Sequence, residues 1–298
     1  MAAYINHAQM ASETYNEIKK ERILKTEIES KIMTTFSHGI DLSDYNEITH
    51  NIKTQEFLLN FFKRVKSEKQ LENPRIMAML YGHICHYFLD TLIHPYVYYI
   101  ERGTEPVKGQ FISGHLLVES YLSAYFVKTR LEKSITDVKI NRFFTLAPSE
   151  CRKMLDDLYL ETYNLNHVSK NYQRILIELL VCETILKNTP LKNQKLCEGV
   201  VQFRNYLEHN NLSVNEITNE SHQIWVHPVT GELFNSSVTD LYLKSIEKAV
   251  EAIDESNKYL YGNHSLETLK NYFPNISYDT GINLEENQAM TFCRKKTK

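Results

Sequence analysis

The chain has 298 residues, of which 42% are hydrophobic and 24% charged, which is ordinary for a globular protein with a sizeable core. Its net charge of −3 argues against a nucleic-acid binder, because such proteins hold phosphates with an excess of Lys and Arg. Glycine and proline are scarce (9 and 7), which favours long helices over a turn-rich β architecture.

The cysteines and the first residues bear on where the protein is located. The five cysteines are scattered and form no CxxC pair, so we expect reduced thiols in a cytoplasmic protein. The first residues lack the basic and apolar regions of a signal peptide, and no run of consecutive apolar residues is long enough to span a bilayer. We therefore expect a cytoplasmic protein without a transmembrane anchor; its oligomeric state is left open.

The hydrophobic patterns predict helices along almost the whole chain. They are expected over 4–29, 54–67, 74–101, 109–131, 149–164, 169–188, 191–209 and 236–261. The polar segment 34–53 is predicted to be a loop with at most short helical turns, and 224–237 an excursion between helices. Together these elements predict an all-α fold, a multi-helix single domain over residues 1–298.

The third of these helices has clear local signals. Asn73 and Pro74 are typical of a helix start, with Asn at the N-cap and Pro in the first turn. Pro95 predicts a kink or an end near His94, because proline cannot donate the helical hydrogen bond. Without such an end the helix would reach Glu101.

The stretch 83–119 carries imidazole and carboxylate side chains on two consecutive predicted helices. They are His83, His86, Asp90 and His94 on the first, and His115 and Glu119 on the second. The first four lie within about 80° of one another, because a helix advances by about 100° per residue. The last two are four residues apart and share a face. Both side-chain types bind zinc, and burying the carboxylates without partners would cost several kcal/mol each.

Other predicted elements can add ligands to this cluster. His7 lies near the start of the first helix, and Asp41 and His50 lie in the loop before the second. Seven of the twelve histidines occur at or before residue 115. We therefore place the metal site in residues 1–125 and expect residues 126–298 to form a helical scaffold.

The order of these residues resembles the zinc-dependent phospholipase C family of bacteria, all-helical enzymes related in architecture to the P1-type nucleases. That family shows G-x3-H-Y-x2-D followed by H-x3-E. The matching stretches are Asn6-His7, 38–41, Thr49-His50, 82–90 and 114–119. The resemblance covers the first 125 residues, and beyond them only the helical character agrees.

The resemblance implies a three-zinc site. The ligands fall into three groups: Asp41, His50, His86 and Asp90; His7 with Asp90, which bridges two ions; and a histidine after Asp90 with His115 and Glu119. The secreted enzymes also use their mature N-terminal tryptophan, whereas this chain begins Met-Ala-Ala-Tyr, so two or three zinc ions are expected.

The histidine that follows Asp90 differs from the family pattern. The family has it six residues later, where this chain has Tyr96. His94 keeps the helical face of Asp90 and is the predicted ligand, with His83 as the alternative ligand or as an outer hydrogen-bond donor.

These features predict a zinc-dependent phosphoric diester hydrolase of the phospholipase C type, in which metal-activated water attacks a phospholipid-like phosphodiester. Asp41 is the predicted catalytic residue, accepting the proton of that water as well as binding metal. Two alternatives stay open: a P1-like nuclease, against which the net charge argues mildly, and a non-catalytic helical protein with a structural zinc. Eight candidate ligands exceed the four that one structural zinc needs, which favours several ions.

Overall fold

The structure is a computed structural model that describes residues 4–38, 46–101, 114–186, 217–262 and 264–292. Its α-helices are α1 (Tyr4–Lys20), α2 (Ser30–Phe36), α3 (Asn46–Asn51), α4 (Thr54–Ser67), α5 (Pro74–Glu101), α6 (Gly114–Leu131), α7 (Ser149–Tyr163), α8 (Val168–Leu186), α11 (Val238–Tyr261) and α12 (Leu266–Tyr272). Short 3-10 turns occur at Gln70–Glu72, Ile135–Asp137 and Ile140–Arg142. The predicted all-α fold is confirmed.

The one sheet in the described residues is a two-stranded hairpin, β1 (Trp225–Val226) and β2 (Leu233–Phe234). The strands are antiparallel, with Trp225 opposite Phe234. This hairpin occupies the segment predicted as an excursion between helices, and its two-residue strands are too short to give a period-2 pattern.

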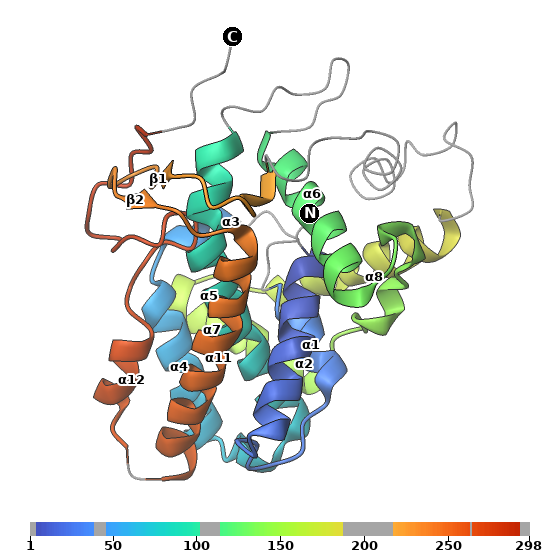
Figure 1. The fold of residues 1–298 in the computed structure, drawn as a ribbon. Helices are drawn as coiled ribbons and strands as arrows, with labels where there is room; N and C mark the ends of the chain where they lie inside the picture. Colours follow the sequence, from blue (N-terminus) through green and yellow to red (C-terminus); the bar gives the residue numbers. More distant parts are fainter. Residues whose placement is uncertain (1–3, 39–45, 102–113, 187–216, 263, 293–298) are drawn as a thin grey trace.

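Helix α5 forms the centre of the molecule. It is buried on nearly every side, and α1, α2, α4, α6, α7 and α11 all pack against it. Figure 1 shows it within the bundle, behind α11. Within the described residues, α5 is also the one helix long and apolar enough to cross a membrane, but 94% of its apolar window is buried inside the protein. A helix that is apolar all round and so covered is typical of a protein core.

Helix α5 spans the predicted range, begins at the predicted N-cap and passes through Pro95. The side-chain Oδ1 of Asn73 accepts hydrogen bonds from the backbone N–H groups of Arg75 (3.1 Å) and Ile76 (3.3 Å), so the predicted N-cap is confirmed. Of the two outcomes predicted at Pro95, a kink or an end, the end near His94 does not occur, and α5 continues to the predicted limit at Glu101. Packing on all sides outweighs the one helical hydrogen bond that proline removes.

A second segment comes close to α5 where Pro95 interrupts the helical bonding. Pro95 cannot bond the carbonyl four residues before it, that of Thr91. Gly281 lies against this carbonyl: a Cβ at position 281 would stand 2.8 Å from Thr91 O, and the backbone there has φ +66°. Only glycine suits both conditions, so the C-terminal segment is held close to the middle of α5.

The segment before α4 was predicted less well. The helix expected over 4–29 ends at Lys20, and a separate helix, α2, begins at Ser30. The loop predicted over 34–53 contains the end of α2 and all of α3, while residues 39–45 lie outside the described part. Helix α2 forms because it packs on α5 at Gly82, where a Cβ would be 2.6 Å from Met33 O.

Three of the later helices follow the predictions closely, whereas α12 was not predicted. The helices predicted over 149–164, 169–188 and 236–261 correspond to α7, α8 and α11. The helix predicted over 109–131 begins at Gly114 in the described residues, and the one predicted over 191–209 lies outside them. Helix α11 packs on both α5 and α1. That the chain forms one domain stays a prediction.

Candidate metal centre

Three turns of α5 place His86, Asp90 and His94 on one face, as the four-residue spacing requires. Their exposed fractions are 3%, 2% and 6%, so the whole face is buried. A carboxylate this deep in an apolar helix needs partners, because an isolated buried charge is very costly.

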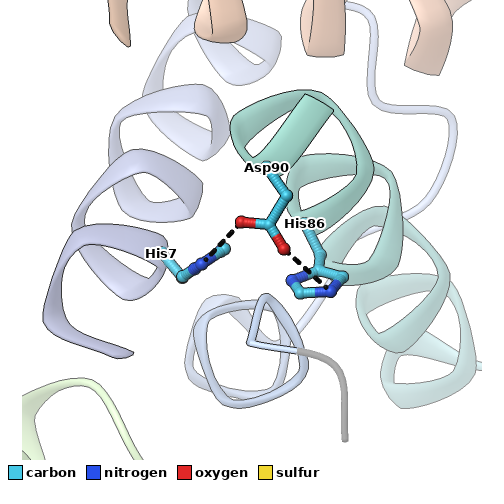
Figure 2. Close-up of side chains that lie close together, drawn as sticks. All are labelled: His7, His86 and Asp90. Carbon is cyan, nitrogen blue, oxygen red and sulfur yellow. Dashed lines mark ion pairs between the residues drawn. The ribbon is translucent and has the colours of Figure 1, made fainter. Parts of the chain in front are cut away.

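Asp90 finds its partners in imidazole rings from three helices. Its Oδ1 lies 3.0 Å from Nε2 of His7, on α1, and its Oδ2 lies 3.3 Å from Nε2 of His86. Figure 2 shows these two rings on either side of the carboxylate. Nε2 of His50, on α3, and Nε2 of His94 each lie 3.6 Å from an Asp90 oxygen. Four histidines thus direct the same ring nitrogen toward one carboxylate.

A second carboxylate continues the cluster onto α6. Oε1 of Glu119 lies 3.2 Å from Nε2 of His94 and 3.2 Å from Nε2 of His115. The other ring nitrogen of His115 lies 3.0 Å from Oε2 of Glu101, at the end of α5. His94 therefore lies between Asp90 and Glu119 and links the two halves of the cluster.

A third carboxylate, Asp279, joins the cluster from the segment after α12. Its Oδ1 lies 3.1 Å from Nδ1 of His50 and 3.8 Å from Nδ1 of His94. Sequence reasoning missed this residue, which is 229 positions from His50 in the chain. No local pattern marks Asp279, since only tertiary packing brings it to the cluster.

Three groups of these side chains have donor atoms within 4.8 Å of one another, close enough to share an ion: His7, His86 and Asp90; His94, His115 and Glu119; and His50, His94 and Asp279. Seven of the eight residues predicted as ligands are thus brought together. The eighth, Asp41, lies outside the described residues.

His83, the alternative ligand, has a different environment. Its Nδ1 lies 2.9 Å from the carbonyl oxygen of Met79, one turn earlier in α5. Its ring packs against Phe36, Phe57 and Phe61, with centroids 5.5 to 5.9 Å apart. Within the described residues His83 belongs to none of the three groups, whereas His94 belongs to two.

The electrostatics of the cluster favour ionised carboxylates. Burial raises the pKa of Asp90, but the charges of His94, His86 and His7 outweigh it and hold that pKa well below its usual range. For Glu119, burial again raises the pKa, and His115 and His94 lower it well below normal. Both carboxylates are therefore ionised at neutral pH.

The histidines beside Glu119 show the opposite shift. Burial lowers the pKa of His115, but Glu119 and Glu101 outweigh it and raise the pKa to about 10. Burial also lowers the pKa of His94, but Asp90 and Glu119 outweigh this effect, so the pKa of His94 is raised as well. Without metal, these rings hold protons where a cation would otherwise bind, so cation binding must release protons.

The donor set fits zinc. Oδ2 of Asp90 and Nδ1 of His7 are buried and have no hydrogen-bond partner among the described residues. The ring nitrogens near Oδ2 lie at ion-pair distance but outside hydrogen-bond geometry, which leaves a carboxylate lone pair available among imidazoles. Imidazole nitrogen and carboxylate oxygen are typical ligands of catalytic zinc.

The fold and the cluster define a class of protein: an all-helical bundle whose core helix carries a buried candidate metal centre. Comparison with known families is more specific. A family model described as zinc dependent phospholipase C matches residues 6–165. The match spans more than half of the chain and includes all eight predicted ligands. The chain belongs to the zinc-dependent phospholipase C family.

The family resemblance inferred from the first 125 residues is therefore confirmed, and it extends to residue 165. The family name carries zinc dependence with it and indicates a hydrolase. The comparisons with curated proteins and with solved structures each gave no match.

Proposed function

We propose that this protein is a zinc-dependent phosphoric diester hydrolase of the phospholipase C type, acting on a phospholipid-like phosphodiester. The observation that carries the proposal is Asp90, with the Nε2 atoms of four histidines within 3.6 Å of its carboxylate oxygens. The family match supplies the class of reaction.

Two or three zinc ions would be held by this cluster. His7, His86 and Asp90 would hold one, and His94, His115 and Glu119 a second. His50, beside Asp90, would join Asp41 in holding a third. Bound zinc lowers the pKa of water and polarises a phosphoryl oxygen, which is the chemistry that hydrolysis of a phosphodiester needs.

The residues of the chain would supply the rest. Asp90 and Glu119 stay ionised at neutral pH and supply the negative charge that balances the cations. Asp41 would accept the proton of the attacking water. Tyr98 lies half-buried at the edge of the cluster, with its ring centroid 4.7 Å from that of His115, and would contact the substrate.

The two other functions have less support. A nuclease would need a cationic surface for its polyanionic substrate, and the net charge is −3. A structural zinc needs four ligands, whereas three groups of candidate donors occur here, two of which share His94. We also propose a cytoplasmic location, supported by Cys85 and Cys151, which are free thiols buried in the core.

Metal analysis and substrate assays test this proposal. We expect two or three zincs per chain in purified protein, and turnover of p-nitrophenyl phosphocholine or phosphatidylcholine that EDTA abolishes and zinc restores. One zinc without turnover would indicate the structural role, and no zinc would contradict both. Cleavage of single-stranded DNA in preference to the choline esters would favour the nuclease.

A further inference from the structure

We propose that Asp279 is a positioning residue of the metal centre: its carboxylate accepts a hydrogen bond from Nδ1–H of His50 and faces Nδ1–H of His94, which the neighbouring carbonyl of Tyr278 accepts, so that both rings direct Nε2 toward the metal ions. This inference rests on the proposed function. It assigns a role to a residue outside the matched family region, which ends at residue 165.

The two rings have the same orientation relative to Asp279. Oδ1 of Asp279 lies 3.1 Å from Nδ1 of His50 and 3.8 Å from Nδ1 of His94. The opposite nitrogens point into the cluster: Nε2 of His50 lies 3.6 Å from Asp90, and Nε2 of His94 lies 3.2 Å from Glu119. The Asp279 carboxylate thus lies next to the outer ring nitrogen of two candidate ligands.

The surroundings of His94 decide which ring nitrogen carries the proton. Its Nδ1 lies 3.1 Å from the backbone carbonyl oxygen of Tyr278 and faces Asp279 as well. Both groups are acceptors only, so Nδ1 must be the donor. In a neutral ring Nε2 then keeps its lone pair, as a metal ligand requires. A metal ion bound at Nδ1 would instead have to displace that proton from between two acceptors.

Asp279 is itself held firmly in place. The side-chain amide of Asn51 donates to its Oδ2 at 2.7 Å, and the hydroxyl of Tyr98 also hydrogen-bonds to this carboxylate, whose Oδ1 is the oxygen that faces the two histidines. The hydroxyl of Ser277 donates to Oδ1 of Asn51 at 2.6 Å and accepts from the backbone N–H of Asp279 at 3.1 Å. The backbone N–H of Tyr278 donates to the carbonyl of His50 at 2.9 Å. The turn 277–279 is therefore bonded directly to α3, beside one of the rings that it orients.

A carboxylate hydrogen-bonded behind a metal-binding imidazole fixes the tautomer and the ring orientation and makes the free nitrogen a better ligand. Burial raises the pKa of Asp279, but the hydrogen bond and charge of His50 outweigh it and lower that pKa to about 2, so the carboxylate is ionised throughout the neutral range. The negative charge of Asp279 would thus strengthen His50 through a hydrogen bond at 3.1 Å and His94 through its proximity at 3.8 Å.

The test measures zinc binding directly, in the full-length protein, by competition with a chromophoric chelator. Asp279→Asn keeps the size of the side chain and removes its charge, and Asp279→Ala removes its oxygens. We expect both to weaken zinc binding by about 10- to 100-fold, while saturating zinc still fills as many sites as in the wild type. The absorption spectrum of the Co²⁺-substituted protein should also change, because two ligands lose their fixed orientation.

Asp156→Asn is the matched control. Asp156 is a partly buried carboxylate that binds the backbone N–H and hydroxyl of Ser169 at 2.8 and 2.6 Å, at the start of α8. Its removal should affect folding stability and leave zinc affinity and the Co²⁺ spectrum unchanged. An equal loss of zinc affinity in this control would make the effect at Asp279 merely structural and overturn the inference.

Two results at Asp279 would also overturn it. Unchanged zinc affinity would remove any role at the centre, and the loss of one zinc at saturation would make Asp279 a ligand. Nitrogen-15 spectra of the histidines in the zinc-loaded wild type give a test without any variant: we expect Nδ1–H on His50 and His94, and Nε2–H on either contradicts the proposal. If the wild type binds no zinc, the proposed function itself fails.

Discussion

Imidazole rings from α1, α3 and α5 surround Asp90, so its negative charge attracts members of more than one candidate ligand group. Its nearest ring nitrogen is Nε2 of His7, at 3.0 Å, and its second oxygen has no hydrogen-bond partner among the described residues. A buried carboxylate of this kind is costly to keep unless cations or protonated rings balance it.

Replacement of Asp90 by Asn tests that role. The amide has no charge and one acceptor oxygen in place of two, so it should not bridge two cations. We expect the loss of at least one zinc per chain and of metal-dependent turnover, measured by elemental analysis and by the phosphocholine assay. Asp156→Asn is again the control. Full zinc content in Asp90→Asn would show that the carboxylate does not bridge.

The raised pKa of His115 predicts a pH dependence of stability in metal-free protein. The folded-state pKa is about 10, against an ordinary value of 6.5 in the unfolded chain. Stabilisation by the protonated ring is therefore fully present below pH 6.5 and is lost as the pH rises through about 10.

We expect His115→Gln to be less stable than the wild type at pH 6 and to approach it as the pH nears 10, in urea denaturation with EDTA present. His167→Gln, a histidine outside the candidate ligand groups, is the control. A stability difference between wild type and His115→Gln that stays constant from pH 6 to pH 10 would contradict the assigned pairing of His115 with Glu101 and Glu119.

At the scale of elements, the segment after α12 is held to α5 by one close approach. Gly281 has φ +66° and lies where a Cβ would be 2.8 Å from Thr91 O. Pro95 removes the helical partner of that carbonyl, and Asp279 lies two residues before Gly281. The break in the hydrogen bonding of α5 at Pro95 and the approach of the Asp279 carboxylate therefore occur at the same part of the helix.

Gly281→Ala should move this segment. The left-handed backbone alone costs a non-glycine residue roughly 1–2 kcal/mol, and the contact with Thr91 adds to it. We expect a lower midpoint of thermal unfolding together with weaker zinc binding. Gly231→Ala is matched to it, with φ +75° and the ring end of Phe292 as its neighbour at 3.0 Å, and should lower stability only. Equal zinc affinity in both variants would show that the position of the segment after α12 does not affect the metal centre.

Periodicity in the sequence could predict the long helices because burial repeats along them, as in α5 and α11. It could not predict where α1 ends and α2 begins, since that depends on Gly82 admitting the backbone of α2 at Met33. The alignment of His86, Asp90 and His94 follows from helical spacing alone. The position of Asp279 does not follow from the sequence, because its approach to His50 depends on a contact between residues 229 positions apart.

For the whole molecule, the candidate ligands come from four separate helices, α1, α3, α5 and α6. Bound cations would cross-link these helices in the folded state, and the unfolded chain would offer no such arrangement. Binding to the folded state alone stabilises it by about 2.7 kcal/mol when free ligand is at one hundred times its dissociation constant.

EDTA should therefore lower the midpoint of thermal unfolding by several degrees, and added zinc should restore it. Differential scanning calorimetry measures both. The double variant His86→Ala with His115→Ala is the control, because it lacks a ligand from each of two groups and should show a much smaller shift. Equal midpoints with zinc and with EDTA in the wild type would contradict cross-linking by metal.

His94 is shared between two carboxylates: its Nε2 lies 3.2 Å from Glu119 and 3.6 Å from Asp90. A ring nitrogen has one lone pair, which it can donate to only one cation at a time. Neighbouring ions would therefore compete for this histidine, and occupancy of the first would make the second harder to fill. Stepwise loading, seen as two separate inflections in a calorimetric titration of the metal-free protein with zinc, is the consequence of that single shared ring.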